Sequence, residues 1–570
     1  MVFLHLYLIS KTFVIDKAGG IRTAYAGYGD IPLHLTQITK FAYDKLDNLN
    51  EPIYIGEKIK YPFAINLISG LLLRLTGAIR FSVLFPVMLF ASANILLLYL
   101  IYKKLLGKSV LASLALIIFF FSSGFGAYSY IQKARAEHQN IGQFFETLTA
   151  NNISVNNQLD AKYPKQNIVY NAPIDLSFLH QRPFFLGLFG FALLLLFLFR
   201  IEEKRHIAYT IAAGVIYGSL PIIHTHSFVA ASITLASVWS AALFAKKGEF
   251  ARKILISTII GIIIAMPQMY YLLNTKNTLN GSADFAAFRI GWMTQPTIGS
   301  AQFPDLASGF SAFSLPYLKF TWLNLGILLP TFLIAIILIF FVRKFFNFST
   351  KSNNSAHYWI FVSAISGLIL FLTVELVKFQ PWDFDNNKLL VYWQLFAAPL
   401  AIYLFSKLYQ RAKIIGIISL TIFAIISLSS GVLDVIPRIL VKEDRMPVIF
   451  DINARNLAQY IRQNIPENDI VLTGTSHLNP VSSLAGRDTL VGYPGWLWTR
   501  GINYSEREGD IKSFYLDPFG YKNVISKYNV KYILFDLQSI YDYHANQSTF
   551  DREFTEVFSE GQYRLYKISK

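Results

Sequence analysis

Ten apolar segments of membrane-crossing length most constrain what this chain can fold into. The hydrocarbon core of a bilayer is about 30 Å thick, and an α-helix of roughly 20 apolar residues crosses it. The segments, each 17–23 residues long, are 80–102, 109–126, 183–200, 207–223, 226–245, 253–272, 320–342, 357–377, 389–408 and 413–433. A soluble globule cannot bury so many apolar helices, so the segments predict an all-α polytopic membrane protein.

The first fifteen residues add one more span to this prediction. They are apolar up to Asp16, but as a helix they reach only about 22 Å, short of a full crossing. We expect a short first span rather than a cleaved signal peptide, because no basic start and no small-residue cleavage site accompany the segment. The prediction is therefore about 11 transmembrane helices.

The composition agrees with a membrane protein and excludes other classes. Of the 570 residues, 54% are hydrophobic and 15% are charged, and the mean hydropathy is +0.41. Such a chain is neither disordered nor held together by disulfides. Because there is no Cys, thiolate catalysis and Cys-ligated zinc are excluded as well.

Basic residues gather in every second short loop, which predicts the topology. These loops are 103–108, 200–205, 246–253, 343–351 and 407–413. Cytoplasmic loops of membrane proteins are rich in Lys and Arg, so the net charge of +16 indicates orientation and does not imply a nucleic-acid partner. An odd number of spans then puts the N-terminus in the cytoplasm and the C-terminal segment outside.

Two domains are expected. Residues 1–435 form a membrane domain with a long first outer loop, 16–79, and residues 445–570 form a small extracytoplasmic α/β domain. The elements predicted for the second domain are a helix over 454–465 and strands over 470–473, 532–535 and 563–566.

The first outer loop carries an acidic candidate. Asp30 precedes an amphipathic stretch that ends near Leu46, and a second apolar stretch runs over 61–75, so we expect two helices along the membrane surface. Asp30 is either functional or an N-cap with Pro32 in the first turn. His34 follows Asp30 by four residues and shares its helix face, or is a solvated interfacial histidine.

Two further candidates stand at the outer ends of apolar segments. Arg182 has a side chain whose planar fork matches phosphate oxygens, although an Arg at this depth can also snorkel to the surface. His224 and His226 lie in a tight turn at the membrane boundary, where ionisable residues are usually functional. No third metal ligand is evident, so phosphate or substrate binding is favoured over metal, and a buried structural pair is the alternative.

The densest polar cluster beside a span contains Trp382, Asp383, Asp385 and Lys388. Carboxylates interleaved with aromatic rings suit a sugar, whose hydroxyls they bind and whose faces the rings cover. The same oxygens suit a hard divalent cation such as Mg²⁺ or Mn²⁺. A membrane-boundary aromatic followed by an acidic turn is the structural alternative. In the C-terminal domain, the Gly- and Trp-rich stretch 492–501 is either a saccharide platform or a docking surface for the membrane domain.

This layout resembles the GT-C membrane glycosyltransferases, which include protein O-mannosyltransferases, the catalytic subunit of oligosaccharyltransferase and aminoarabinose transferases. The segment from Tyr61-Pro62 through Leu75-Thr76-Gly77 into Arg80 is similar to their surface helix and second span, and Asp30 matches the catalytic carboxylate of their first loop. Many members of the family have two adjacent acidic residues in this loop, whereas this chain has Gly29-Asp30-Ile31. It also lacks the WWDYG motif of oligosaccharyltransferases, which argues against asparagine as acceptor.

The resemblance implies a mechanism. A polyprenyl-phosphate sugar would be the donor, Asp30 the general base on an acceptor hydroxyl, and transfer would invert the anomeric carbon. Arg182, His224, His226 and Lys388 would stabilise the departing phosphate, and Trp382, Asp383, Asp385 and His34 would contact the sugar or acceptor, which is a glycan, lipid or protein. By family habit the enzyme resides in the plasma membrane. A non-catalytic envelope scaffold and a transporter of lipid-linked glycans are the alternatives.

Overall fold

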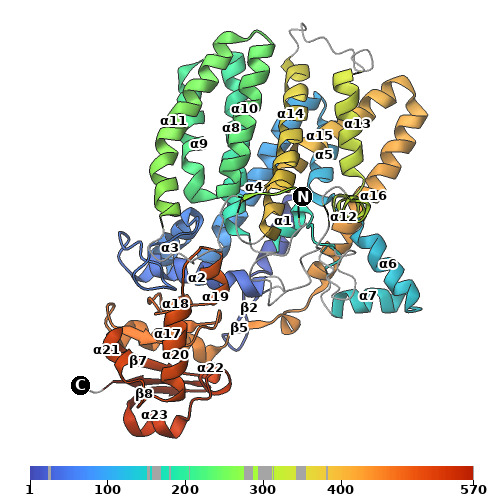
Figure 1. Cartoon of the computed structure of the whole chain (residues 1–570). Coiled ribbons are helices and arrows are strands. Elements are labelled where there is room, and N and C mark those ends of the chain that lie inside the picture. Colours follow the sequence, from blue (N-terminus) through green and yellow to red (C-terminus); the bar gives the residue numbers. More distant parts are fainter. Residues whose placement is uncertain are drawn as a thin grey trace.

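The computed structural model is a helical bundle with an α/β region below one end (Figure 1). It describes residues 1–23, 27–150, 154–156, 168–178, 181–204, 206–274, 287–292, 311, 314–341, 355–379 and 383–568. The predicted fold class, a polytopic helical membrane protein with a small C-terminal α/β region, is confirmed.

Seven helices in the described part of the chain are long and apolar enough to cross a membrane. They are α4 (Ile79–Leu106), α8 (Arg182–Lys204), α10 (Thr225–Phe244), α11 (Gly248–Leu273), α14 (Ser355–Leu376), α15 (Asn387–Arg411) and α16 (Lys413–Leu440). Two shorter helices among the predicted spans are α1 (Val2–Ser10) and α9 (Ile207–Ile223).

The predicted count of 11 straight spans is not confirmed, because two predicted spans are broken. The segment 320–342 divides into α12 (Leu315–Leu325) and α13 (Leu328–Phe341), bent by 98°, and the segment 109–126 ends with α5 (Ser109–Phe121), bent by 54° from α6 (Gly126–Ala136). With each bent pair counted as one span, the described residues give up to nine.

The two breaks contact each other. Gly326 has a φ of +61°, and a side chain on it would meet the carbonyl oxygen of Ser123 at 2.5 Å. The amide of Phe125 also donates to the carbonyl of Leu323 at 2.8 Å. A glycine with positive φ lets the chain turn and lets the two backbones approach closely. The hydropathy of the sequence indicates neither the turn nor the close approach of the two backbones.

Helix α15 lies in the centre of the bundle. Its apolar window is 89% buried, the largest share among the seven long helices. Polar side chains hold it to its neighbours by bonding backbone carbonyls: Gln394 donates to Phe119 at 2.9 Å, and Tyr102 on α4 donates to Leu395 at 2.9 Å. Such bonds between helices compensate for the absence of a hydrophobic driving force inside a bilayer.

The two helices expected in the first outer loop are present. They are α2 (Gly27–Tyr43) and α3 (Ala64–Thr76), which pack on each other at the end of the bundle nearest the C-terminal region (Figure 1). Their close crossing requires Gly70, because a side chain there would meet the Cβ of Phe41 at 2.5 Å.

The C-terminal region contains a four-stranded sheet with the order β6-β7-β9-β8, in which β6 and β7 are parallel and the other pairs antiparallel. The predicted helix and three strands correspond to α17 (Ile452–Asn464), β6 (Ile470–Leu472), β7 (Val530–Phe535) and β9 (Tyr563–Lys567). Strand β8 (Thr555–Glu560) was not predicted. The short helices are α18 (Pro480–Ser483), α19 (Pro494–Trp498), α20 (Ser505–Leu516), α21 (Asn523–Lys527), α22 (Leu537–Tyr541) and α23 (Gln547–Glu553).

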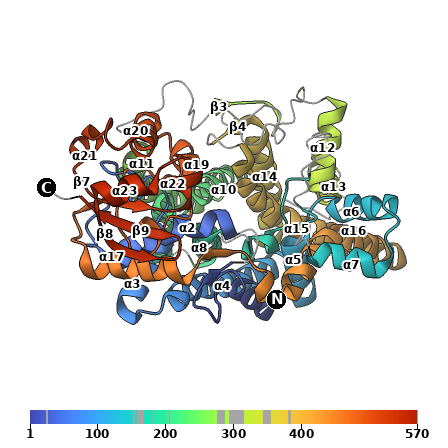
Figure 2. The same cartoon turned by 90° about the horizontal axis from the view of Figure 1, so that it is seen from below.

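The first outer loop joins this region to the bundle. Strands β1 (Val14–Ile15) and β2 (Ile21–Arg22) form a sheet with β5 (Val448–Phe450), and α18 packs on α2. Lys40 of α2 is fully buried and its ammonium lies 2.6 Å from a carboxylate oxygen of Asp488. Seen from below, the C-terminal sheet covers one part of the bundle's end, while α6 and α7 (Ile141–Ala150) lie on the other side beside α16 (Figure 2).

The remaining described elements are short. They are β3 (Ala287–Phe288), β4 (Val377–Lys378), and the 3-10 turns η2 (Pro173–Ser177), η6 (Asp383–Asn386) and η7 (Glu443–Arg445). Strands β3 and β4 pair in an antiparallel ladder. Turn η6 leads directly into α15, so it fixes how that helix begins.

Candidate functional site

Asp30 lies in the first turn of α2, where the first outer loop meets the bundle. Its carboxylate Oδ2 accepts a hydrogen bond from the Nε2 of Gln181, which directly precedes α8. The side chain is half-buried. Asp30 therefore faces the membrane helices, and a group that approaches from the outer loop can still reach it.

A lysine and a second carboxylate set the electrostatics around Asp30. Burial raises the pKa of Asp30 to about 6, the charge of Lys388 opposes that rise, and the charge of Asp385 adds to it. The Nζ of Lys388 lies 3.2 Å from the Oδ1 of Asp385. A carboxyl group with a pKa near neutrality, beside a cation, is typical of acid–base sites.

A small cavity opens beside this group. It has a volume of about 60 Å³. It is lined by Tyr170, Asn171, Leu176, Gln181, Asp385, Asn387, Lys388 and Val391. This space admits a few atoms and is too small for a whole sugar.

Arg182 and His34 belong to one buried hydrogen-bond network. Arg182 is fully buried: its Nε donates to the Oδ1 of Asn66 at 3.1 Å, and its two other nitrogens donate to the carbonyl of Val83 and to Ser69. The alternative of a snorkelling Arg182 is therefore wrong. The described contacts of its guanidinium hold α8 against α3 and α4.

This network also fixes the proton on His34. Because Arg182 only donates, the Asn66 atom that it contacts is the oxygen, so the Asn66 nitrogen faces the Nδ1 of His34 at 3.0 Å. Burial, followed by the charge of Arg182, holds the pKa of His34 well below its usual value. His34 is thus neutral, with its proton on Nε2. With an exposure of 2%, it is not the solvated histidine considered as an alternative.

His224, between α9 and α10, and His226, in the first turn of α10, form a pair of tilted rings. Their ring centroids lie 5.3 Å apart, and the Nδ1 of His224 lies 2.7 Å from the Oγ of Ser227, which also bonds Tyr392 of α15. Both rings are in electrostatic range of Lys388. The turn therefore belongs to the same charged neighbourhood as Asp30.

The described residues do not fit a divalent cation. Mg²⁺ and Mn²⁺ take about six oxygen ligands. No group of three or more His, Asp or Glu side chains in the described part of the chain is arranged to hold a metal ion. Moreover, the carboxylate of Asp385 is already paired with the ammonium of Lys388.

Two of the predicted site residues cannot be placed. Trp382 lies outside the described residues. The loop 343–351, which was predicted as a cytoplasmic loop and not as part of the site, also lies outside them. Asp383 begins η6, but its side chain is likewise outside the described set. The structure brings together the other predicted residues around Asp30 and Lys388, with Arg182 and His34 in the adjoining network.

Sequence reasoning missed two groups that border the site. Tyr61 packs against His34, with the ring centroids 5.9 Å apart, and the guanidinium of Arg500 lies 5.3 Å from the Tyr61 ring centroid. Arg500 also pairs with the buried Glu51 at 2.6 Å. The Gly- and Trp-rich stretch therefore contributes a docking contact between the C-terminal region and the first outer loop. The position of Arg500 close to Trp498 in that stretch was the available signal.

No family model matches this sequence, and no curated protein matches it significantly. Solved structures do match in three dimensions. The archaeal oligosaccharyltransferase AglB from Archaeoglobus fulgidus, in complex with an inhibitory peptide and a dolichol-phosphate, aligns with a TM-score of 0.52 and 12% identity over 100% of this chain and 74% of that chain. Its apo form gives the same values. ArnT from Cupriavidus metallidurans aligns at a TM-score of 0.39 and 10% identity, over 99% of this chain and 96% of that chain. The likeness to AglB shows that this chain shares its fold.

Proposed function

We propose that this protein is an integral membrane glycosyltransferase that moves a sugar from a polyprenyl-phosphate donor to an acceptor hydroxyl on the extracytoplasmic face. The observation that carries the proposal is the half-buried Asp30 carboxylate, with a pKa of about 6, beside Lys388. Such a carboxylate is mostly deprotonated at neutral pH, and it is a stronger base than an ordinary aspartate.

The proposed reaction is a single inverting displacement. Asp30 takes the proton of the acceptor hydroxyl as its oxygen attacks the anomeric carbon. The bond between that carbon and the phosphate oxygen breaks, and the polyprenyl phosphate leaves with the bonding electrons. Because the phosphate departs as a stable anion, no second carboxylic acid is required, in contrast to ordinary glycoside hydrolysis.

The phosphate requires donors and positive charge near Asp30. Lys388 supplies the charge at the start of α15, and its pairing with Asp385 keeps the ammonium beside the small cavity. His224 and His226 supply ring nitrogens in the same neighbourhood, and neutral His34 supplies an Nε2 proton. Preorganised donors and cations of this kind stabilise the charge that develops on a leaving group.

Arg182 stabilises the helices next to this site. Its predicted contact with the donor phosphate requires free donors, whereas three of its nitrogens hold Asn66, Ser69 and the Val83 carbonyl. We therefore assign it to stability, and we assign the phosphate contact to Lys388 and the histidine pair.

The donor class is supported by the complex of AglB with a dolichol-phosphate, since this chain shares the fold of AglB. The acceptor is a hydroxyl of a glycan, lipid or protein. The loop between α10 and α11, which contains Lys247, and the junction of α15 and α16, which contains Lys413, lie at the end of the bundle away from α2 (Figure 1). The positive-inside rule then puts that end in the cytoplasm, and it puts Asp30 and the C-terminal region outside the plasma membrane.

The test is donor turnover by purified protein in lipid nanodiscs, with a panel of polyprenyl-phosphate sugars and acceptors. Asp30→Asn keeps the size of the side chain and its bond with Gln181 but removes the base. We expect release of polyprenyl phosphate to fall by at least roughly a hundredfold, the usual contribution of general-base catalysis.

The matched control is Asp47→Asn, an exposed aspartate of the same outer loop. It should turn over donor as the unaltered protein does. Equal rates in the Asp30→Asn and unaltered proteins would remove Asp30 from the chemistry. Absence of turnover with every donor would favour the scaffold or transporter functions.

A further inference from the structure

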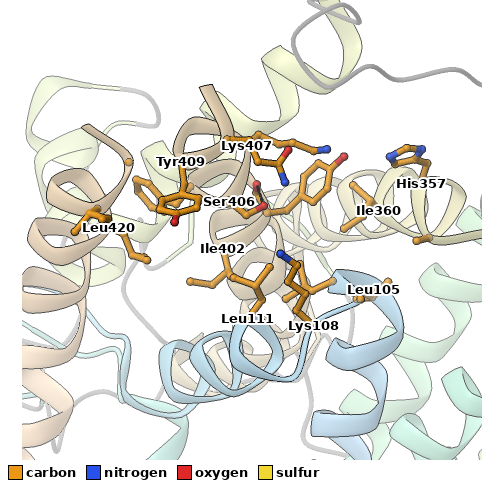
Figure 3. A pocket seen from close by; sticks show the side chains of 18 residues that line it. Leu105, Lys108, Leu111, His357, Ile360, Ile402, Ser406, Lys407, Tyr409 and Leu420 are labelled. Carbon is orange, nitrogen blue, oxygen red and sulfur yellow. Dashed lines mark hydrogen bonds between the residues drawn. The ribbon is translucent and has the colours of Figure 1, made fainter. Parts of the chain in front are cut away.

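A second cavity lies at the opposite end of the bundle from Asp30. It has a volume of about 450 Å³ and is formed where five helices end or begin: α4, α5, α14, α15 and α16 (Figure 3). The space is large enough for a lipid headgroup and the start of an acyl chain. Nothing in the proposed transfer reaction uses it.

The polar part of this cavity is cationic. Lys108 and Lys407 line it together with His357, and none of the described residues that line it is acidic. Three helices, α5, α14 and α16, begin at the cavity, and Lys108, His357 and Gly416 from their first residues line it. Helix N-termini carry partial positive charge and favour anions. The ends of α4 and α15 at the same cavity carry the opposite partial charge, so the full charges of the two lysines set its sign.

Tyr403, Ser406, Tyr409 and Gln410 add neutral polar groups, and most of the remaining wall is apolar and continues onto a lipid-facing surface. Leu105, Leu111, Ile360, Ile402 and Leu420 form that wall. Beyond it, α16 presents a run of strongly exposed side chains, namely Ile414, Ile415, Ile417, Ile418, Ile422 and Ile425. In a helix of this apolarity such a face contacts acyl chains.

We propose that this cavity binds an anionic phospholipid of the surrounding membrane. The phosphate lies between Lys108 and Lys407, and an acyl chain follows the exposed isoleucines of α16 into the bilayer. Charge complementarity selects the headgroup, because the described residues that line the cavity supply cations and no carboxylate that would repel a phosphate. The open apolar face selects a lipid over a soluble anion.

The test is native mass spectrometry of the full-length protein released from nanodiscs that contain equal amounts of phosphatidylglycerol and phosphatidylcholine. We expect the unaltered protein to retain phosphatidylglycerol preferentially. The double variant Lys108→Gln, Lys407→Gln should retain at least tenfold less. The matched control is Lys103→Gln, Lys413→Gln, which removes the same charge from exposed lysines at the same end outside the cavity. It should retain phosphatidylglycerol as the unaltered protein does.

A second variant separates the cavity from surface charge. Leu111→Trp leaves both lysines in place but fills the cavity, so it should also lower retention. An equal loss in the control would overturn the proposal in favour of diffuse attraction, as would retention of phosphatidylcholine at the same level. Displacement of phosphatidylglycerol by an equal concentration of undecaprenyl phosphate would overturn it by identifying a polyprenyl phosphate as the occupant.

Discussion

Helix α15 carries a lysine at each end, and the two lysines have different surroundings. Lys388, in the first turn, lies 3.2 Å from the Asp385 carboxylate and in the field of Asp30. Lys407, near the last turn, packs over the ring of Tyr403 at 5.3 Å and lines a cavity in which none of the described lining residues is acidic. At a rise of about 1.5 Å per residue, their separation of 19 positions corresponds to roughly 29 Å.

The surroundings of the two lysines suit two different roles. One set suits the transfer reaction, and the other suits the binding of a lipid. A proton acceptor and a departing phosphate need opposite charges held at short range, and the Asp30 end supplies both within a network of buried hydrogen bonds. A lipid headgroup needs only cations and an apolar wall that is open to the bilayer, which is what the Lys407 end supplies. The same residue type on one helix is thus expected to serve two purposes.

The largest expected difference between the two ends concerns Lys388. Lys388→Gln removes the cation nearest the leaving phosphate, and we expect the transfer rate to fall by roughly a hundred- to a thousandfold, as when one oxyanion donor is lost. Initial rates of polyprenyl phosphate release at saturating donor would measure it. A fall of less than about fivefold would show that the phosphate is stabilised elsewhere.

The dependence of the transfer rate on pH tests the same pair of charged groups, Asp30 and Lys388. Since Asp30 acts as base only when deprotonated and its pKa is about 6, the rate should be constant above that pH and fall about tenfold per unit below it. Lys388 lowers the pKa of Asp30, so residual transfer by Lys388→Gln should begin to fall at a higher pH. Lys407→Gln is the control, and its profile should not move. A rate that stays flat to pH 5 would exclude Asp30 as the base.

Arg182→Lys tests the network behind the site. A lysine cannot reproduce the bonds that the planar guanidinium makes with Asn66, Ser69 and the Val83 carbonyl. Losing hydrogen bonds of a buried charged group costs roughly 2–3 kcal/mol. The apparent melting temperature in detergent should therefore drop by several degrees, whereas Arg80→Lys, at an exposed arginine of α4, should leave it nearly unchanged. An unchanged melting temperature in Arg182→Lys would return the guanidinium to a role in donor binding.

These predictions rest on features that differ in how far the sequence reveals them. Span positions follow from length and hydropathy, which is why 80–102 and 413–433 correspond to α4 and α16. The break between α12 and α13 at Gly326 cannot be predicted from length and hydropathy, because it depends on a close approach to Ser123 from a distant segment. Asp30 was marked by its place in the first outer loop and by the family resemblance, and the two histidines and Lys388 were marked by their positions at the ends of spans. The contacts of Arg182 and Arg500 could not be predicted, because the burial and the partners of a cation depend on the tertiary structure.

The smallest expected effect on the transfer rate is that of Lys407→Gln, at the other end of α15 from Lys388. Coulomb's law for two unit charges 29 Å apart gives about 0.6 kcal/mol at an effective dielectric constant of 20, or less than a threefold change in rate. Lys407→Gln should therefore change transfer by less than about threefold, while Lys388→Gln, on the same helix, abolishes most of it. Both variants would be measured in one nanodisc preparation, with phosphatidylglycerol present at constant fraction. A tenfold loss in Lys407→Gln exceeds what charge alone transmits over that distance, and it would show that occupancy of the distant cavity controls the reaction at Asp30.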